Sequence, residues 1–308
     1  MDAQSIIEKV LLETVKEQRR ARRWRIFFRF IYLAIIIFGI YAFNPGRLDI
    51  ESHEKQVAVV DLAGIIDNSN QTYQTVSDGL KAALENKNTV AVVIKANSPG
   101  GSPVYSNMLY DEILRLRKQY PKKPIDVVIE EVCASGCYYI ASAATNIYAN
   151  PSSIIGSIGV IYTGFGATEL IKKLGIDSRL LISGKNKAMG YPFIPANKEQ
   201  EQMQQQMLDQ VHQQFITAVE QGRGKKLKLD TPDLFSGRYW VGEDGMKIGL
   251  IDGYATVDTL AKDKYKTDNV VDYSEKADPL DKLAKRMGLQ TATYIKQGLS
   301  LDNFNSFR

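Results

Sequence analysis

The sequence predicts an α/β fold in which parallel strands are covered by helices on both faces. Two strand-length runs, 56–62 and 89–95, are rich in Val and Ile and lack the apolar–polar alternation of a half-exposed strand. A segment with helical spacing of its apolar residues, 72–85, lies between them. Buried strands that alternate with helices are typical of a parallel sheet.

The same alternation continues through most of the chain. Residues 233–264 are expected to form a small closing unit of helix, strand and helix, and residues 265–308 a polar, mobile tail. Helical spacing predicts further helices over 104–119, 135–144, 167–173 and 197–221, and apolar runs predict further strands over 125–130, 147–149, 158–162 and 179–183.

The composition is that of a globular protein with one local cluster of charge. Hydrophobic residues make up 44% and charged residues 24% of the chain, which excludes a largely disordered protein. The net charge is +4, but residues 16–29 alone hold seven Lys or Arg against one acid, Glu17. Such a cluster favours either nucleic acid or an anionic membrane surface.

An apolar segment directly after the cluster favours the membrane over nucleic acid. Residues 30–43 carry no charge, and with 26–28 the run reaches about 18 residues, near the lower limit for a spanning helix. Arg29 interrupts the run close to one end, from where its side chain can reach the lipid headgroups. We therefore predict a transmembrane anchor over 26–46.

The basic residues also predict the orientation of this anchor. The positive-inside rule places residues 1–25, a basic amphipathic helix, in the cytoplasm and the domain over 47–264 in the periplasm. We therefore expect a single-pass protein of the inner (plasma) membrane. The alternatives are a cleaved signal peptide and a buried core helix; an n-region of more than twenty residues and the charge asymmetry argue against them.

The chain contains two cysteines, Cys133 and Cys137. Two cysteines cannot form a framework of disulfides, and a bridge at a turn would have to satisfy strict geometry. We expect both to be small packing residues, with an exposed redox pair as the alternative.

The two histidines make two common kinds of catalytic site difficult to build. His53 lies in a predicted linker and His212 on the predicted long helix, and neither adjoins a Ser or Cys in a catalytic-looking loop. A Ser-His-Asp triad or a His-ligated metal site is therefore disfavoured, and no metal or other cofactor is expected. A nucleophilic serine would need another base, for which lysine is the usual substitute.

A candidate nucleophile lies where a predicted strand meets a helix of small residues. Ser135 stands at this junction, where its hydroxyl would be exposed and backbone N–H groups at the helix start could stabilise an oxyanion. Gly136 leaves room for a substrate carbonyl to approach. The alternative is that Ser135 only caps the helix, which is a common role for serine.

A Pro-Gly-Gly turn follows the strand that ends at Lys95. Gly100 and Gly101 would place flexible backbone at the carboxyl edge of the sheet, where ligands bind in parallel α/β folds. Their N–H groups could supply a second oxyanion donor, although Pro-Gly also marks any ordinary turn. The turn precedes Ser135 by one strand–helix repeat, so the two loops are expected to be neighbours.

Residues 182–190 carry two candidate bases. A lysine acts as a base only when it is neutral, a state that burial favours. Lys187 precedes the apolar run Ala-Met-Gly-Tyr-Pro-Phe, which could desolvate it, whereas Lys185 follows Gly184 in what is expected to be an exposed turn. The alternative is that both are surface lysines.

Together, and in this order, these segments resemble the signal peptide peptidase A (SppA) family of serine proteases, in its short form with one protease domain. The resemblance covers roughly residues 56–264 and implies the fold of the Clp protease and crotonase superfamily, a superhelix of repeated ββα and βα units. The matching segments are 97–102, 134–142, 149–151, 156–160, 183–187 and 237–252.

This resemblance implies a role for each candidate residue. Ser135 would be the nucleophile, Lys187 the general base, and Ser157 the residue that hydrogen-bonds and orients the lysine amine. The oxyanion hole would come from the backbone of three glycines, Gly100, Gly101 and Gly136.

The resemblance also implies a setting and a substrate. Family members assemble into a ring or dome on the membrane, and in short forms the Ser and Lys can come from adjacent subunits. The expected substrates are signal peptides left in the membrane after secretion, with no nucleic acid involved. Cys137 departs from the family pattern, which has a smaller residue such as glycine there, so the side-chain specificity stays open.

Three other functions remain as alternatives at this point. The first is a protease of other membrane proteins, and the second is a catalytically inactive family member that serves as a membrane scaffold. The third, a crotonase-like acyl-CoA enzyme, is disfavoured because an extracytoplasmic domain would meet no coenzyme A.

Overall fold

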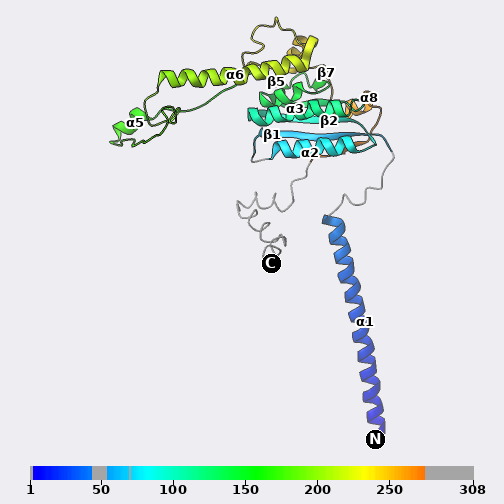
Figure 1. The fold of residues 1–308 in the computed structure, drawn as a ribbon. Coiled ribbons are helices and arrows are strands. Elements are labelled where there is room, and N and C mark those ends of the chain that lie inside the picture. The colour runs from blue at the N-terminus through cyan, green and yellow to red at the C-terminus, as the bar shows by residue number, and fades with distance from the viewer. Residues whose placement is uncertain (1–2, 44–53, 69–70, 275–308) are drawn as a thin grey trace, which may run out of the picture. The chain divides into compact units, whose positions relative to one another are not determined.

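The computed structural model describes residues 3–43, 54–68 and 71–274, and the chain divides into two units between residues 53 and 54 (Figure 1). The described part of the first unit is one helix, α1 (Ala3–Phe43). The sequence predicts an amphipathic helix and a separate anchor here. The structure instead has a single continuous helix, because no proline interrupts these residues.

Large apolar side chains are exposed on α1, among them Trp24, Phe30 and Ile35. Over the residues that the structure describes, no helix combines the length and the apolar character that crossing a membrane requires. The predicted transmembrane anchor over 26–46 is therefore not confirmed, and its last residues, 44–46, lie outside the described ranges.

The second unit is built on an eight-stranded sheet with the order β6-β5-β3-β2-β1-β8, to which β4 and β7 attach beside β3. Every pair is parallel except β5 and β6. The strands are β1 (Gln56–Ile66), β2 (Thr89–Gly101), β3 (Ile125–Ala134), β4 (Ile147–Ala149), β5 (Ile154–Gly156), β6 (Tyr239–Val241), β7 (Gly253–Tyr254) and β8 (Val270–Asp272).

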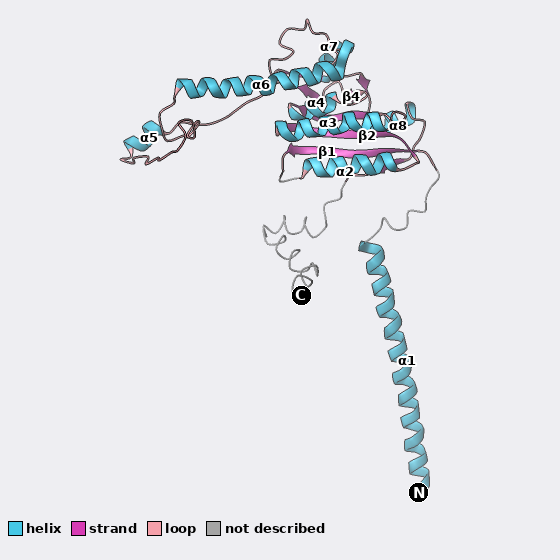
Figure 2. Cartoon of the chain, viewed as in Figure 1, coloured by secondary structure: helices cyan, strands magenta, loops and turns pink. Residues whose placement is uncertain are grey.

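Helices cover both faces of this sheet (Figure 2), as the continuous Val/Ile runs predict. One face packs side chains such as Val60 and Ile94 against α2, α3, α4 and α6, and the other packs side chains such as Val57 and Val93 against α8. The helices of this unit are α2 (Thr72–Glu85), α3 (Pro103–Gln119), α4 (Gly136–Ser142), α5 (Thr168–Lys173), α6 (Lys198–Arg223), α7 (Gly242–Ile248) and α8 (Val257–Asp263).

Helix α4 lies at the centre of the larger core, and all of its residues are buried. The Tyr138 hydroxyl donates to the carbonyl of Leu250 over 2.7 Å, and the Tyr139 ring stacks on Phe215 of α6 with ring centroids 4.9 Å apart. A Cβ on Gly222 would lie 2.0 Å from the Ser142 carbonyl oxygen, so α6 approaches α4 as closely as backbones allow.

The carboxyl end of α6 is held by a buried ion pair. Arg223 lies 2.8 Å from the carboxylate of Asp252 and also donates from Nε to the carbonyl of Gly249 over 3.0 Å. Burial opposes ionisation of Asp252, but the hydrogen bonds and charge of Arg223, with a further contact from Lys226, outweigh it and lower the pKa of Asp252. This pair joins α6 to the closing unit.

Strand β2 is longer than the sequence predicts. It continues through the Pro-Gly-Gly segment to Gly101, which pairs with Ile66 of β1. A Cβ on Gly101 would lie 2.2 Å from the Ile66 carbonyl oxygen, so only glycine allows this pairing. The prediction of a flexible loop at this place is therefore wrong.

Two of the predicted strands are absent from the described part of the chain. Residues 158–162 and 179–183 pair with no other strand. Ile158 is buried, but most of the other side chains are exposed, with Ile161 at 85% and Leu181 at 98%. An apolar run does not form a strand when nothing satisfies its backbone N–H and C=O groups.

The predicted tail begins later than residue 265. Strand β8 pairs with β1 through Val270 opposite Val57, and the N–H of Tyr273 donates to the carbonyl of Val59 over 2.8 Å. Residues 265–274 therefore belong to the folded domain. The remainder of the predicted tail, 275–308, lies outside the described residues.

Candidate active site

Ser135 occupies a sharp turn between the end of β3 and the start of α4. Its φ of 53° lies in the left-handed region, which is rare for a residue other than glycine and costs on the order of 1–3 kcal/mol. Two hydrogen bonds hold the turn: the Ser135 N–H donates to Gly156 over 2.8 Å, and the Ser135 carbonyl accepts from Tyr139 over 3.0 Å.

The side chain of Ser135 does not cap α4. Ser135 is the N-cap residue by position, but its hydroxyl makes no capping hydrogen bond. The alternative reading of this serine as a simple helix cap is therefore wrong. A half-buried hydroxyl on a strained strand-to-helix turn is instead the arrangement that presents a nucleophile.

The glycine segment of β2 lies directly against this turn, as the sequence predicts. A Cβ on Gly100, whose φ is +100°, would lie 2.7 Å from the backbone nitrogen of Gly136 and 2.9 Å from Cβ of Ser135. Gly136 is the first residue of α4, so its N–H has no partner within the helix. The Gly100 N–H donates to the buried Ser98 hydroxyl over 3.1 Å.

Ser157 lies at the end of the neighbouring strand. Gly156 pairs with Ala134, which puts Ser157 beside the Ser135 turn. Ser157 also has a positive φ, 51°, and its N–H donates to the carbonyl of Arg238 over 2.9 Å. The structure thus brings together five of the six residues predicted for the site: Ser135, Ser157, Gly100, Gly101 and Gly136.

Lys187 is the residue that the structure does not bring to this site. Its side chain is exposed, and the turn that carries it packs on the amino end of α6. There Gln200 donates to the carbonyl of Lys185 over 3.1 Å, and the Lys185 amine lies 3.5 Å from the Glu199 carboxylate. Both lysines are therefore surface residues within a single chain.

Helix α6 separates Lys187 from the serines. His212 of α6 hydrogen-bonds the carbonyl of Ile158, next to Ser157, over 3.1 Å. Gln200, which contacts the lysine turn, stands about 18 Å from His212 along the helix axis at 1.5 Å per residue. In Figure 1 the segment that includes α5 likewise lies off the end of α6 away from the sheet.

His212 is a residue near the site that sequence reasoning missed. It approaches Ile158 only because α6 docks across the core, so nothing in the local sequence predicts the contact. Its Nε2 is held against a carbonyl, which requires a hydrogen on that nitrogen.

The segment between Ser157 and α6, here called the arm segment (158–197), exposes many large apolar side chains. Soluble monomers rarely expose such groups together, and contiguous exposed apolar surface marks sites of interaction. The exposed residues are Ile161, Tyr162, Phe165, Leu170, Leu174, Ile176, Leu180, Leu181, Ile182 and Tyr191.

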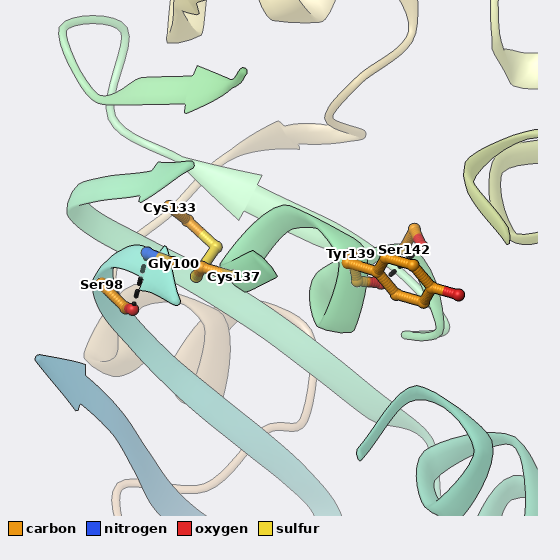
Figure 3. The surroundings of a disulfide bond; sticks show 6 residues. All are labelled: Ser98, Gly100, Cys133, Cys137, Tyr139 and Ser142. Carbon is orange, nitrogen blue, oxygen red and sulfur yellow. Dashed lines mark hydrogen bonds between the residues drawn. A yellow bond between two sulfur atoms is a disulfide. The ribbon is translucent and has the colours of Figure 1, made fainter. Parts of the chain in front are cut away.

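Cys133 and Cys137 form a disulfide (Figure 3), and Ser135 lies midway between them in the sequence. The expectation that they are packing residues or an exposed redox pair is corrected, because both are bonded and both are 0% exposed. The sharp turn brings their Cα atoms to 5.1 Å, within the usual disulfide range. A ring this small stabilises the whole fold by only about 2 kcal/mol in the chain-entropy model.

Comparison with known proteins agrees with this geometry. The model of peptidase family S49 matches residues 117–271, which include Ser135, Ser157 and Lys187. The chain belongs to peptidase family S49. The resemblance to the SppA serine proteases of this family is thereby confirmed.

Three relatives illustrate the range of the family. A Na(+)/H(+) antiporter NhaA of Brucella abortus is 41% identical over 60% of this chain and 25% of its own length. "Putative protease MJ0651" of Methanocaldococcus jannaschii is 35% identical over 61% of this chain and 59% of its own. "Putative signal peptide peptidase SppA" of Enterococcus faecium is 27% identical over 84% of this chain and 80% of its own. The chain therefore spans about a quarter of the antiporter's length and most of the Enterococcus protein.

Proposed function

We propose that this chain is a serine endopeptidase in which Ser135 is the nucleophile and Lys187 the general base. The observation that carries the proposal is the uncapped Ser135 hydroxyl on a strained turn against the backbones of Gly100 and Gly136. Membership of peptidase family S49 supports it. The same geometry argues against the alternative of a catalytically inactive scaffold, which would not need to maintain a strained serine.

The reaction follows from the arrangement around Ser135. Neutral Lys187 takes the hydroxyl proton as Oγ attacks the scissile carbonyl carbon, and it returns that proton to the leaving amine as the C–N bond breaks. Water then hydrolyses the acyl-enzyme with the same lysine as base. Ser157 orients the lysine amine.

Backbone N–H groups would stabilise the oxyanion during this attack. Gly136 supplies one donor, because its N–H has no partner within α4. The second donor comes from Gly100 or Gly101. Since Gly100 already donates to Ser98, its N–H would have to exchange this partner for the substrate oxygen.

The dyad is completed between two copies of the chain. Lys187 is exposed in one chain, and its turn is anchored on α6 away from Ser135. When the apolar arm segment of one copy docks on a second copy, it would bury its own Lys187 beside Ser135 of the second copy. Burial would favour the neutral amine that a base requires. Repetition of this contact gives the ring-like homo-oligomer expected from the family resemblance.

The apolar run over 26–46, of which residues 26–43 belong to α1, anchors the protein in the inner (plasma) membrane, with the amino terminus in the cytoplasm and the protease domain in the periplasm. The basic residues of 16–29 precede the apolar run, as the positive-inside rule requires. The Cys133–Cys137 disulfide supports the same topology, because disulfides persist in oxidising compartments outside the cytoplasm.

The substrates are apolar peptides at the membrane, first of all signal peptides that remain after secretion. A relative that matches 84% of this chain is named as a signal peptide peptidase, which supports this choice. Cleavage of other membrane proteins is the alternative, and a comparison of the two substrate classes on the purified protein distinguishes them.

Cleavage of an apolar fluorogenic peptide by the full chain in detergent tests the proposal. We expect Ser135→Ala and Lys187→Ala to reduce activity to background. Lys185→Ala is the matched control, because this lysine lies two residues away in the same exposed turn and should keep the parent's activity. Full activity of Ser135→Ala would overturn the proposal.

The pH dependence of the same assay tests the base. A lysine base acts only when neutral, so activity should rise as the pH is raised. His212→Gln should show the parent's profile. A rate that does not change with pH would contradict a titrating lysine.

A further inference from the structure

The Cys133–Cys137 disulfide closes a small ring (Figure 3), and Ser135 is the middle residue of the segment between the two cysteines. Cys133 is the last but one residue of β3 and lies opposite Ser98 of β2 and Ile155 of β5. Cys137 is in the first turn of α4. The bridge therefore joins the two elements whose meeting point carries the nucleophile.

The conformation of Ser135 depends on the distance between these two elements. Its positive φ is not one that serine prefers, so the surroundings must impose it. The hydrogen bonds to Gly156 and from Tyr139 fix the N–H and C=O of Ser135 itself. The disulfide adds the covalent limit on how far β3 and α4 can move apart.

The bridge is also next to the expected oxyanion hole. Ser98, which lies opposite Cys133, accepts the N–H of Gly100, and Gly100 lies so close to Gly136 that a Cβ on it would be 2.7 Å from the Gly136 nitrogen. A shift of Cys133 would therefore move the nucleophile and its neighbouring donors together.

The position of the bridge argues against redox catalysis by the two cysteines. Both are 0% exposed within the larger core cluster, and thiol–disulfide exchange requires access to a sulfur. A static role is consistent with this burial.

We propose that the Cys133–Cys137 disulfide is a positioning element for Ser135, which holds the turn in the conformation needed for attack. This inference rests on the proposed function. Opening the bridge should lower kcat by about tenfold or more, since a displacement of about 1 Å can cost about 100-fold in rate. The KM should stay unchanged, because both cysteines are 0% exposed and so lie out of reach of a bound peptide.

Three variants test the proposal in the full-length protein: Cys133→Ala, Cys137→Ala and the double variant. Either single change removes the whole bridge, so each should lose as much kcat as the double variant. If the cysteines act only by packing, the two losses should instead add in the double variant. Ser142→Ala is the matched control, because this buried serine is at the other end of α4 and should keep the parent's kcat.

Alkylation of the denatured parent shows whether the bridge exists. Both cysteines should react only after a dithiol has reduced them, a step in which two electrons and two protons pass to the cysteines and the dithiol becomes a cyclic disulfide. Reduction under conditions that open the native bridge should lower the parent's kcat and leave that of the double variant unchanged.

The outcomes separate this inference from the proposed function. If the parent is active, three results would overturn the positioning role alone. The cysteine variants could have the parent's kcat, their losses in kcat could add in the double variant, or the parent's cysteines could react without reductant. A parent that cleaves no peptide overturns the proposed function and this inference with it.

Discussion

The turn around Ser135 and the arm segment (158–197) differ in how completely one chain determines them. Ser135 is held by two backbone hydrogen bonds, close glycine contacts and a disulfide, all within the core. Lys187 stands in an exposed turn that contacts the rest of the chain through Gln200 and Glu199 of α6. A single chain therefore fixes the conformation of Ser135, the proposed nucleophile, but leaves Lys187, the proposed base, exposed and away from Ser135.

The largest expected effect is on stability, and it comes from comparing a buried ion pair of the core with an exposed pair on the arm segment. Asp252→Ala would leave Arg223 buried without its partner and should lower the free energy of unfolding by about 3–5 kcal/mol. Glu199→Ala removes the exposed pair with Lys185 and should cost about 0–1 kcal/mol. Urea unfolding of both variants measures the difference, and equal losses would contradict the contrast.

Two glycines with nearly the same φ give the next comparison. A Cβ on Gly100 would press on Gly136 and Ser135, so Gly100→Ala should lower kcat by about 100-fold through displacement of the turn. A Cβ on Gly184 meets nothing within 4 Å, so Gly184→Ala should cost only the strain of a positive φ, on the order of 1–3 kcal/mol of stability. Peptide cleavage and thermal unfolding separate these effects.

Acidification should weaken the core region more than the arm segment. The pKa of Asp252 is lowered from its usual value of 3.8 in the folded state. Its contribution to stability is therefore complete above the unfolded pKa and is lost as the pH falls through the folded pKa. Unfolding measured from neutral to acidic pH should show this loss in the parent. Asp252→Asn should show a smaller loss, and an equal slope in both would contradict the assignment.

The smallest effect on stability is expected within the arm segment itself. Leu181 is 98% exposed, so Leu181→Ser should change the free energy of unfolding by less than about 0.5 kcal/mol. If the arm segment docks on a second copy, the same change should weaken self-association, as measured by sedimentation. Unchanged association would show that Leu181 is outside the interface.

Local pattern was enough to predict the elements that pack within one chain. The bounds of α2 agree with the predicted 72–85, because the apolar residues that have helical spacing in the sequence are the ones that pack on the sheet. The approach of Gly100 to Ser135 was also predicted, since it follows from one strand–helix repeat in a parallel sheet.

Features that depend on distant partners could not be predicted. The extension of β2 to Gly101 requires Ile66, and the approach of His212 to Ile158 requires α6 to be fixed by Arg223. The arm segment has strand-like composition but no partner strand among the described residues, so the predicted strands failed there. The disulfide depends on the turn at Ser135, which spacing alone does not reveal.

Complementation between two inactive variants distinguishes a dyad formed between copies from a dyad within one chain. Ser135→Ala and Lys187→Ala chains with different affinity tags are co-expressed, and assemblies that contain both are purified through the two tags in succession. An intact Ser135 of one chain can then meet an intact Lys187 of the next. If the dyad forms between copies, these mixed assemblies should recover part of the parent's peptidase activity while each variant alone has none. Mixed assemblies of parental size without activity would contradict a dyad formed between copies.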